Sequence, residues 1–121
     1  MTRNISRQTL IVEDEALIAM TIEDMLLELG HTVIGIASSL KTALSLAEEG
    51  TFDFATLDLS LCRKFSYPVA DVFIRREIPF VFATSHPSTE IEEAYRRAPA
   101  LQKPFEPSAL QNAISTAFNS P

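Results

Sequence analysis

The sequence predicts an α/β fold in which a five-stranded parallel sheet is doubly wound, with helices on both faces. The first observation is that short apolar runs alternate with amphipathic stretches five times along the chain. The second is that the first four runs are continuous, β-branched and aromatic, as in strands covered on both faces. The third is size, because 121 residues that are 46% hydrophobic suffice for one buried core. We therefore expect one domain over residues 1–121, with a core of about residues 8–118.

The apolar runs themselves bound the five predicted strands. They cover residues 9–12, 32–37, 54–57, 80–83 and 98–102. Because a helical pattern follows each run, successive strands are expected to lie parallel. Ligands bind beyond the carboxyl ends of the strands in such sheets, so the residues directly after each strand are the candidates for function.

Apolar residues at spacings of three and four predict a helix after each strand. Serines, glycines and prolines mark the limits of the first three helices. Gly30 ends the first, Ser38 or Ser39 caps the second, Gly50 ends it, and Pro68 opens the third, which closes before Pro79.

The fourth and fifth helices are predicted from caps and charge order. Ser88 is placed to cap a fourth helix with acidic residues early and Arg96 and Arg97 late, which suits the helix dipole. The apolar stripe of that helix is thin, and holds Ile91, Ala94 and Tyr95. Pro107 opens the fifth helix, which has a fuller apolar stripe.

Composition and charge exclude several classes of protein. The net charge is −6, and residues 1–60 hold ten acids against three bases, which argues against nucleic-acid binding and is compatible with cation binding. The single Cys62 excludes an internal disulfide and a cysteine zinc site. We find neither a signal peptide nor an apolar stretch long enough to span a membrane, so we expect a cytoplasmic protein.

Polar residues with a shared chemistry follow four of the predicted strands. They are Glu13-Asp14-Glu15, Asp58 with Leu59-Ser60-Leu61, Thr84-Ser85, and Lys103-Pro104-Phe105. If these ends converge, one pocket holds several carboxylates, a hydroxyl and an ammonium. Clustered carboxylates suit Mg²⁺, and an aspartate can act as a nucleophile toward phosphorus. The pattern therefore favours phosphoryl transfer to Asp58, with the metal, the hydroxyl and the lysine around the transferred group.

The same residues, in the same order, resemble the receiver domain of bacterial two-component response regulators over residues 8–118. The resemblance rests on Leu10–Glu15, Asp58–Leu61, Thr84 and Lys103–Phe105. It implies a (βα)5 flavodoxin-like fold with strand order 2-1-3-4-5. The length of 121 residues leaves no room for a second domain, so we expect no attached output domain. The resemblance also implies a signalling protein that catalyses only its own phosphoryl transfer and dephosphorylation.

The resemblance implies a role for each residue of the site. Asp58 accepts a phosphoryl group from a phosphohistidine. Asp14 binds Mg²⁺ directly, Glu13 does so directly or through water, and Asp58 and the backbone carbonyl of Ser60 complete the metal ligands. Thr84 hydrogen-bonds the phosphoryl group, Lys103 pairs with it, and the Lys103-Pro104 peptide is expected to be cis.

A narrower resemblance concerns a receiver subfamily of alphaproteobacteria, often single-domain, named for a Phe-Ala-Thr-Gly-hydrophobic-Tyr run. It rests on Phe80–Thr84, Tyr67–Asp71 and Leu101–Phe105. It implies a sensor histidine kinase of the HWE type, or a histidine phosphotransfer protein, as phosphodonor, and a downstream protein as target. The run departs from the subfamily pattern at Ser85-His86-Pro87, and Ala100 stands where typical receivers have an aromatic switch residue.

Several interpretations stay open at this point. Leu17, Met20 and Leu27 on the first helix form either a kinase-docking patch or peripheral core. Tyr95 with Ile91 marks either an output face or peripheral packing. The two cations after Cys62, Arg63 and Lys64, either steer a partner or are exposed loop charges. Dimerisation is compatible with the sequence, whereas contact with nucleic acid or membrane is not expected.

Two other functions compete with phosphoryl transfer. A receiver-like module that binds partners without phosphorylation would explain the departures at Ser85–Pro87 and after Asp58. An enzyme is disfavoured, because an aspartate-based phosphatase needs a second acid where Ser60 stands. A flavin phosphate would be repelled by the acidic run Glu13–Glu15.

Overall fold

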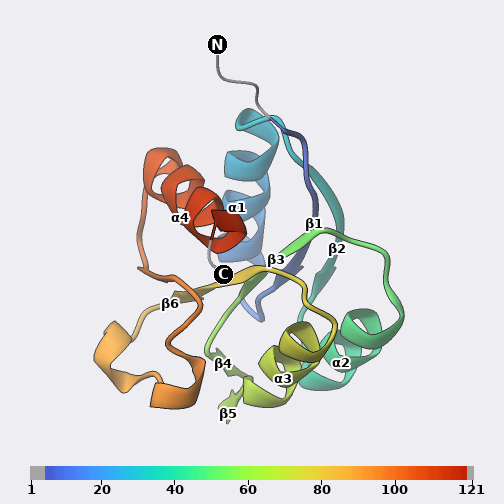
Figure 1. Ribbon diagram of the computed structural model, residues 1–121, viewed down its shortest axis with the longest axis vertical. Helices are drawn as coiled ribbons and strands as arrows, with labels where there is room; N and C mark the ends of the chain where they lie inside the picture. Colours follow the sequence, from blue (N-terminus) through green and yellow to red (C-terminus); the bar gives the residue numbers. More distant parts are fainter. Residues whose placement is uncertain (1–4, 120–121) are drawn as a thin grey trace.

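A five-stranded parallel sheet forms the middle layer of the protein, in the order β2-β1-β3-β6-β7 (Figure 1). The computed structural model describes residues 5–119. The strands of the sheet are β1 (Gln8–Val12), β2 (Thr32–Ala37), β3 (Phe54–Leu57), β6 (Phe80–Thr84) and β7 (Ala100–Gln102). The fold class and the order 2-1-3-4-5 of the main strands are confirmed. The last strand is shorter than predicted, since it begins at Ala100 and not at residue 98.

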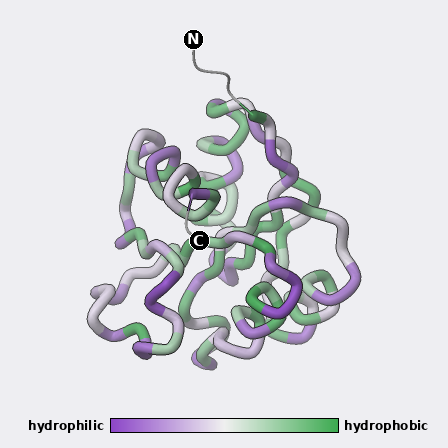
Figure 2. The backbone as a smooth tube through the Cα atoms, in the orientation of Figure 1, coloured by the Kyte–Doolittle hydropathy of each residue, from purple (hydrophilic) through white to green (hydrophobic). Residues whose placement is uncertain are grey.

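Two pairs of α-helices cover the two faces of the sheet (Figure 1). Helices α1 (Ala16–Glu28) and α4 (Pro107–Asn119) pack on one face, and α2 (Leu40–Glu49) and α3 (Tyr67–Arg75) on the other. The tube of α2 and α3 alternates between hydrophobic and hydrophilic residues, as expected for helices with one buried side (Figure 2). Among the described residues, no helix is long and apolar enough to cross a membrane.

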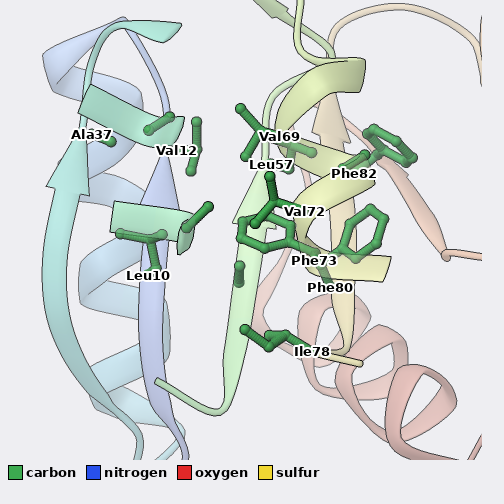
Figure 3. Packing of buried hydrophobic residues seen from close by; sticks show 14 of the residues in the cluster. Leu10, Val12, Ala37, Leu57, Val69, Val72, Phe73, Ile78, Phe80 and Phe82 are labelled. Atoms are coloured by element: carbon green, nitrogen blue, oxygen red, sulfur yellow. The ribbon is translucent and has the colours of Figure 1, made fainter. Parts of the chain in front are cut away.

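The buried side chains form one cluster on each face of the sheet, because successive residues of a strand point to opposite faces. Leu10 and Val12 belong to the cluster under α2 and α3, and Ile11 belongs to the cluster under α1 and α4. Figure 3 shows the first cluster, in which Phe73 of α3 lies against Phe80 of β6, with ring centroids 5.4 Å apart. The two clusters hold the strand ends, and therefore the site, in a rigid frame.

The helix boundaries follow the predicted local signals. Gly30 has a φ of +92°, which is accessible to glycine, and it follows the end of α1. The Ser39 side chain accepts a hydrogen bond from the Thr42 amide at 3.2 Å and caps α2. Pro107 is the first residue of α4, where its missing N–H costs nothing.

The prediction that strand β2 is covered on both faces is wrong. β2 pairs only with β1 and forms an edge of the sheet, and Ile34 and Ile36 are each 40% exposed. The register shifts between Thr9 and Leu10, so one residue of β2 is left without a partner opposite it. An unbroken apolar run predicts a strand, but the run does not show whether the strand lies inside the sheet or at its edge.

The predicted fourth helix is also wrong. The segment after β6 contains two short 3₁₀ turns, η1 (Ser88–Glu90) and η2 (Glu93–Tyr95). Ile91 and Glu92 between them have extended backbone angles, with ψ of 131° and 142°. Ile91 is the one fully buried apolar side chain of the predicted stripe. A favourable charge order could not form a helix here, because too little apolar surface is buried to stabilise it.

Candidate functional site

The register of the sheet brings the candidate residues together at the carboxyl ends of the strands. Val12 of β1 pairs with Leu57 of β3, so the next residues, Glu13 and Asp58, lie side by side. The Asp58 amide continues the ladder by donating to the Val12 carbonyl at 2.9 Å. On the other side, Thr84 of β6 pairs with Gln102 of β7, which places Lys103 at the same edge.

Three carboxylates and one ammonium form the centre of the site. Carboxylate oxygens of Glu13, Asp14 and Asp58 lie within 4.8 Å of one another. Glu13 and Asp58 are buried and Asp14 is half-buried. The Lys103 Nζ donates to Glu13 Oε1 and, at 3.1 Å, to Asp58 Oδ2. One cation therefore stands against three acids, which leaves negative charge to be balanced.

Burial dominates the electrostatics of this cluster. Burial raises the pKa of Glu13 to about 7, although the hydrogen bond from Lys103 acts in the opposite direction. Burial alone would lower the pKa of Lys103, but the hydrogen bond to Glu13 and the charge of Asp58 outweigh it and raise that pKa. Lys103 is thus held as the ammonium, while the crowded carboxylates lack a second positive charge.

The acidic cluster fits a hard divalent cation. Its oxygen donors are the type that Mg²⁺ prefers, and a Mg²⁺ ion needs only one or two carboxylates beside its waters. The Ser60 amide donates to Asp58 Oδ1 at 3.3 Å, which orients the carboxylate. The metal-binding role of the Ser60 carbonyl stays a prediction.

Thr84 ends β6 at the same edge of the sheet and is buried. Its Oγ1 accepts a hydrogen bond from the His86 amide at 3.0 Å, and its carbonyl accepts one from the Lys103 amide at 2.8 Å. The Lys103-Pro104 peptide is cis, as predicted. The strand ends therefore hold the hydroxyl and the ammonium through backbone contacts, while the role of Thr84 toward a phosphoryl group stays a prediction.

Sequence reasoning missed Ser66, which contacts the backbone of Asp58. Ser66 is fully buried, and its hydroxyl donates to the backbone carbonyl of Asp58 and, at 3.1 Å, to that of Leu59. A serine before a proline-opened helix is typical of an N-cap, but this side chain makes no capping hydrogen bond. No local signal distinguishes the two roles, because the partner carbonyls lie seven and eight residues away in the chain.

An unpredicted hairpin follows Asp58 and contacts the acidic cluster at Asp14. It consists of β4 (Ser60–Leu61) and β5 (Lys64–Phe65). Cys62 and Arg63 at its tip have φ of +49° and +69°, a pattern that belongs to a type I′ turn and usually needs Asn or Gly. The Cys62 amide donates to Asp14 Oδ2 at 2.9 Å, so the tip positions a candidate metal ligand.

The two histidines, the two hairpin cations and the exposed apolar residues of α1 lie outside the carboxylate cluster. The His86 side chain pairs with Glu90, with Nδ1 2.8 Å from Oε2, and His31 accepts a bond from the Arg7 amide at its Nδ1. Arg63 and Lys64 are exposed at the hairpin. Leu17, Met20 and Leu27 are all more than half exposed and do not belong to the core.

A cavity of about 420 Å³ adjoins the site. Asp58 and Lys103 belong to its lining, together with apolar side chains such as Ile18, Met25 and Phe105 and the polar residues Glu15, Thr21 and Ser85. A reacting group entering along this cavity would meet the Asp58 carboxylate next to the ammonium.

Comparisons with known proteins give the same class of protein. No family model matches the chain. The solution structure of SdrG from Sphingomonas melonis Fr1 is similar with a TM-score of 0.85 and 39% identity, covering 97% of this chain and 99% of that one. A structure of SdrG in a BeF3-activated conformation has a TM-score of 0.76 and 40% identity, covering 90% and 93%.

Two curated relatives are longer than this chain. The transcriptional regulatory protein PdtaR of Mycobacterium tuberculosis is 35% identical over 119 residues, which are 95% of this chain and 58% of PdtaR. The phyllosphere-induced regulator PhyR of Methylorubrum extorquens is 34% identical over 123 residues, covering 98% of this chain and 46% of PhyR. The chain thus spans about half the length of these relatives.

The chain belongs to the receiver domains of two-component response regulators. Its likeness to SdrG extends over nearly the whole of both chains, and the receiver domain of the response regulator PhyR from Erythrobacter litoralis is similar with a TM-score of 0.80 and 29% identity, covering 96% of this chain and 95% of that one. Within that family it is similar to SdrG and to the PhyR receiver domains. The acidic cluster of Glu13, Asp14 and Asp58 is typical of the receiver site for Mg²⁺.

Proposed function

We propose that Asp58 accepts a phosphoryl group in a Mg²⁺-dependent reaction and that its phosphorylation switches contacts with other proteins. The observation that carries the proposal is the contact of the Lys103 ammonium with Asp58 Oδ2, at 3.1 Å, within the cluster of three carboxylates. A buried acid held between an ammonium and a candidate cation site is arranged for attack on a phosphorus atom and not only for structure.

The residues would divide the reaction between them. An Asp58 oxygen forms a bond to phosphorus while the bond from phosphorus to the donor's imidazole nitrogen breaks, and the bonding electrons leave with that nitrogen, which takes up a proton. Lys103 and the Thr84 hydroxyl would hold the transferred oxygens, and the Ser60 amide keeps the carboxylate oriented. Glu13, Asp14, Asp58 and the Ser60 carbonyl would hold Mg²⁺, which supplies charge neutralisation for those oxygens when bound.

A histidine kinase is the general partner of a receiver domain, and the phosphodonor proposed for this chain is a kinase of the HWE type or a histidine phosphotransfer protein. The chain is a signalling domain, and we assign it no catalysis beyond its own phosphorylation and dephosphorylation. That residues 1–121 form one receiver domain is part of the proposal; PdtaR and PhyR both extend well beyond the matched region.

Intact mass after incubation with acetyl phosphate tests the proposal. We expect a Mg²⁺-dependent gain of one phosphoryl group, which is absent from the Asp58→Asn variant. Ser45→Ala, an exposed change on α2, serves as a matched control and should gain the group normally. If a folded protein gains nothing from acetyl phosphate or from a phosphorylated histidine kinase, the alternative of a phosphorylation-independent binding module takes its place.

A further inference from the structure

The two tyrosines of the protein stack on each other between helix α3 and the 3₁₀ turn η2. Tyr67 is the first residue of α3 and Tyr95 ends η2, and their ring centroids are 4.3 Å apart with planes 15° from parallel. Phe65 of the hairpin also stacks on Tyr67, with ring centroids 5.5 Å apart. Face-to-face aromatic contacts of this kind contribute beyond the area that they bury.

The hydroxyl of each tyrosine also makes a hydrogen bond to the opposite segment. The Tyr67 hydroxyl accepts a bond from the Glu92 amide at 2.9 Å, and the Tyr95 hydroxyl donates to Asp71 Oδ1 at 2.8 Å. The bond to Asp71 raises the pKa of Tyr95 to about 12, so the hydroxyl stays protonated and donating at neutral pH. Helix α3 and the segment with the two 3₁₀ turns are thereby joined by a ring contact and two bonds.

Both tyrosines lie on segments that begin next to residues of the site. On one side, Tyr67 directly follows Ser66, whose hydroxyl holds the Asp58 carbonyl. On the other side, the segment that carries Tyr95 begins after Thr84, and the Thr84 hydroxyl accepts the His86 amide at 3.0 Å. The segment is otherwise lightly packed, since Ile91 is its one fully buried side chain.

We propose that the Tyr67–Tyr95 stack is a latch that opens when Asp58 is phosphorylated. This inference rests on the proposed function. A phosphoryl group on Asp58 offers the Thr84 hydroxyl a stronger acceptor, and a hydroxyl that turns toward it no longer holds the His86 amide in the same position. The segment then shifts relative to α3, and Tyr95 leaves Tyr67. The latch would couple the site to the 88–95 segment in a chain that has Ala100 where other receivers have an aromatic switch residue.

The protein carries its own optical probe for this latch. It contains two tyrosines and no tryptophan, so tyrosine emission and the near-ultraviolet tyrosine circular dichroism report on these two rings alone. We would record both signals before and after adding Mg²⁺ with beryllofluoride, and measure phosphoryl gain by mass in a parallel sample with acetyl phosphate. We expect tyrosine emission to rise and the dichroism to lose amplitude, with no response in Asp58→Asn.

The outcomes separate the latch from the function that it serves. Phosphoryl gain with unchanged tyrosine signals overturns the latch and leaves the proposed function in place. No phosphoryl gain and no beryllofluoride response overturn both. In Asp71→Ala both tyrosine rings remain and the bond from the Tyr95 hydroxyl is lost, so this variant should fold and start with part of the dichroism already lost. A starting dichroism equal to that of the unmodified protein would also contradict the latch.

Discussion

The buried Ser66 hydroxyl donates a hydrogen bond to the backbone carbonyl oxygen of Asp58, eight residues earlier in the chain. This bond closes the loop that contains the β4–β5 hairpin, and the Ser66 amide strengthens the closure by donating to the Leu59 carbonyl at 2.8 Å. The position of the Asp58 side chain therefore depends on a residue that contacts its backbone and not its carboxylate.

Replacing Ser66 with alanine should destabilise the protein and slow phosphorylation of Asp58. The buried Asp58 carbonyl loses its hydroxyl donor, whereas the Leu59 carbonyl keeps the Ser66 amide, and leaving one such group unsatisfied costs about 1–3 kcal/mol. Urea unfolding would measure the loss of stability, and the rate of mass gain with acetyl phosphate would measure the effect on the site. The exposed Ser45→Ala on α2 should change neither. Equal behaviour of the two variants would show that the Ser66 hydroxyl does not position Asp58.

Replacing Lys103 with glutamine should separate metal binding from phosphoryl transfer. The variant keeps all three carboxylates and loses the ammonium that contacts Glu13 and Asp58. We expect the rate of phosphorylation to fall by about tenfold or more, since a charged donor to the transferred oxygens is lost. Calorimetric titration should show that Mg²⁺ affinity is unchanged or higher, because the cluster becomes more negative. A large loss of Mg²⁺ affinity would contradict this division of roles.

His31 should make the stability of the protein fall in acid. Burial lowers the pKa of His31 below 6.5, and its Nδ1 accepts a hydrogen bond from the Arg7 amide at 3.0 Å. The unfolded chain therefore binds a proton more readily than the folded protein does. The contribution of neutral His31 is complete above pH 6.5 and is lost as the pH falls through the lower pKa of the folded state. Urea unfolding between pH 5 and 8 measures the free energy of unfolding of the unmodified protein and of His31→Gln. The variant should lose less stability as the pH falls. An equal dependence of the free energy of unfolding on pH in the two proteins would refute the prediction.

The hairpin tip should become more stable when Arg63 is replaced with glycine. Arg63 has a φ of +69°, a conformation that costs a side-chain-bearing residue about 1–2 kcal/mol and that glycine adopts freely. We expect the midpoint temperature of thermal unfolding to rise, by the equivalent of about 1 kcal/mol in the free energy of unfolding. Part of the gain is offset by the entropy of glycine in the unfolded chain. Lys64→Gly, within β5, is the matched control and should be neutral or destabilising. Stabilisation by both changes, or by neither, would show that the φ of Arg63 is not a source of strain.

The sequence alone predicts most of the sheet and the centre of the site. Continuous apolar runs require burial wherever they lie, and strands of a parallel sheet present their carboxyl ends at one edge, so Glu13, Asp58 and Lys103 could be expected to meet. Glycine and proline signals act over a few residues, which is why Gly30 and Pro107 were correctly assigned. The cis Lys103-Pro104 peptide followed from the family resemblance and is confirmed.

Tertiary structure alone decided the features that depend on distant partners. The exposure of β2 depends on its place at the edge of the sheet. The residues predicted as a fourth helix form 3₁₀ turns that contact Tyr67 of α3 through the Glu92 amide and the Tyr95 ring. Ser66 and Tyr67 acquire their roles only when residues 58 and 95 are brought to them by the fold. Local propensity and periodicity report on neighbours in the chain, whereas these contacts are set by packing across long sequence separations, which no periodicity records.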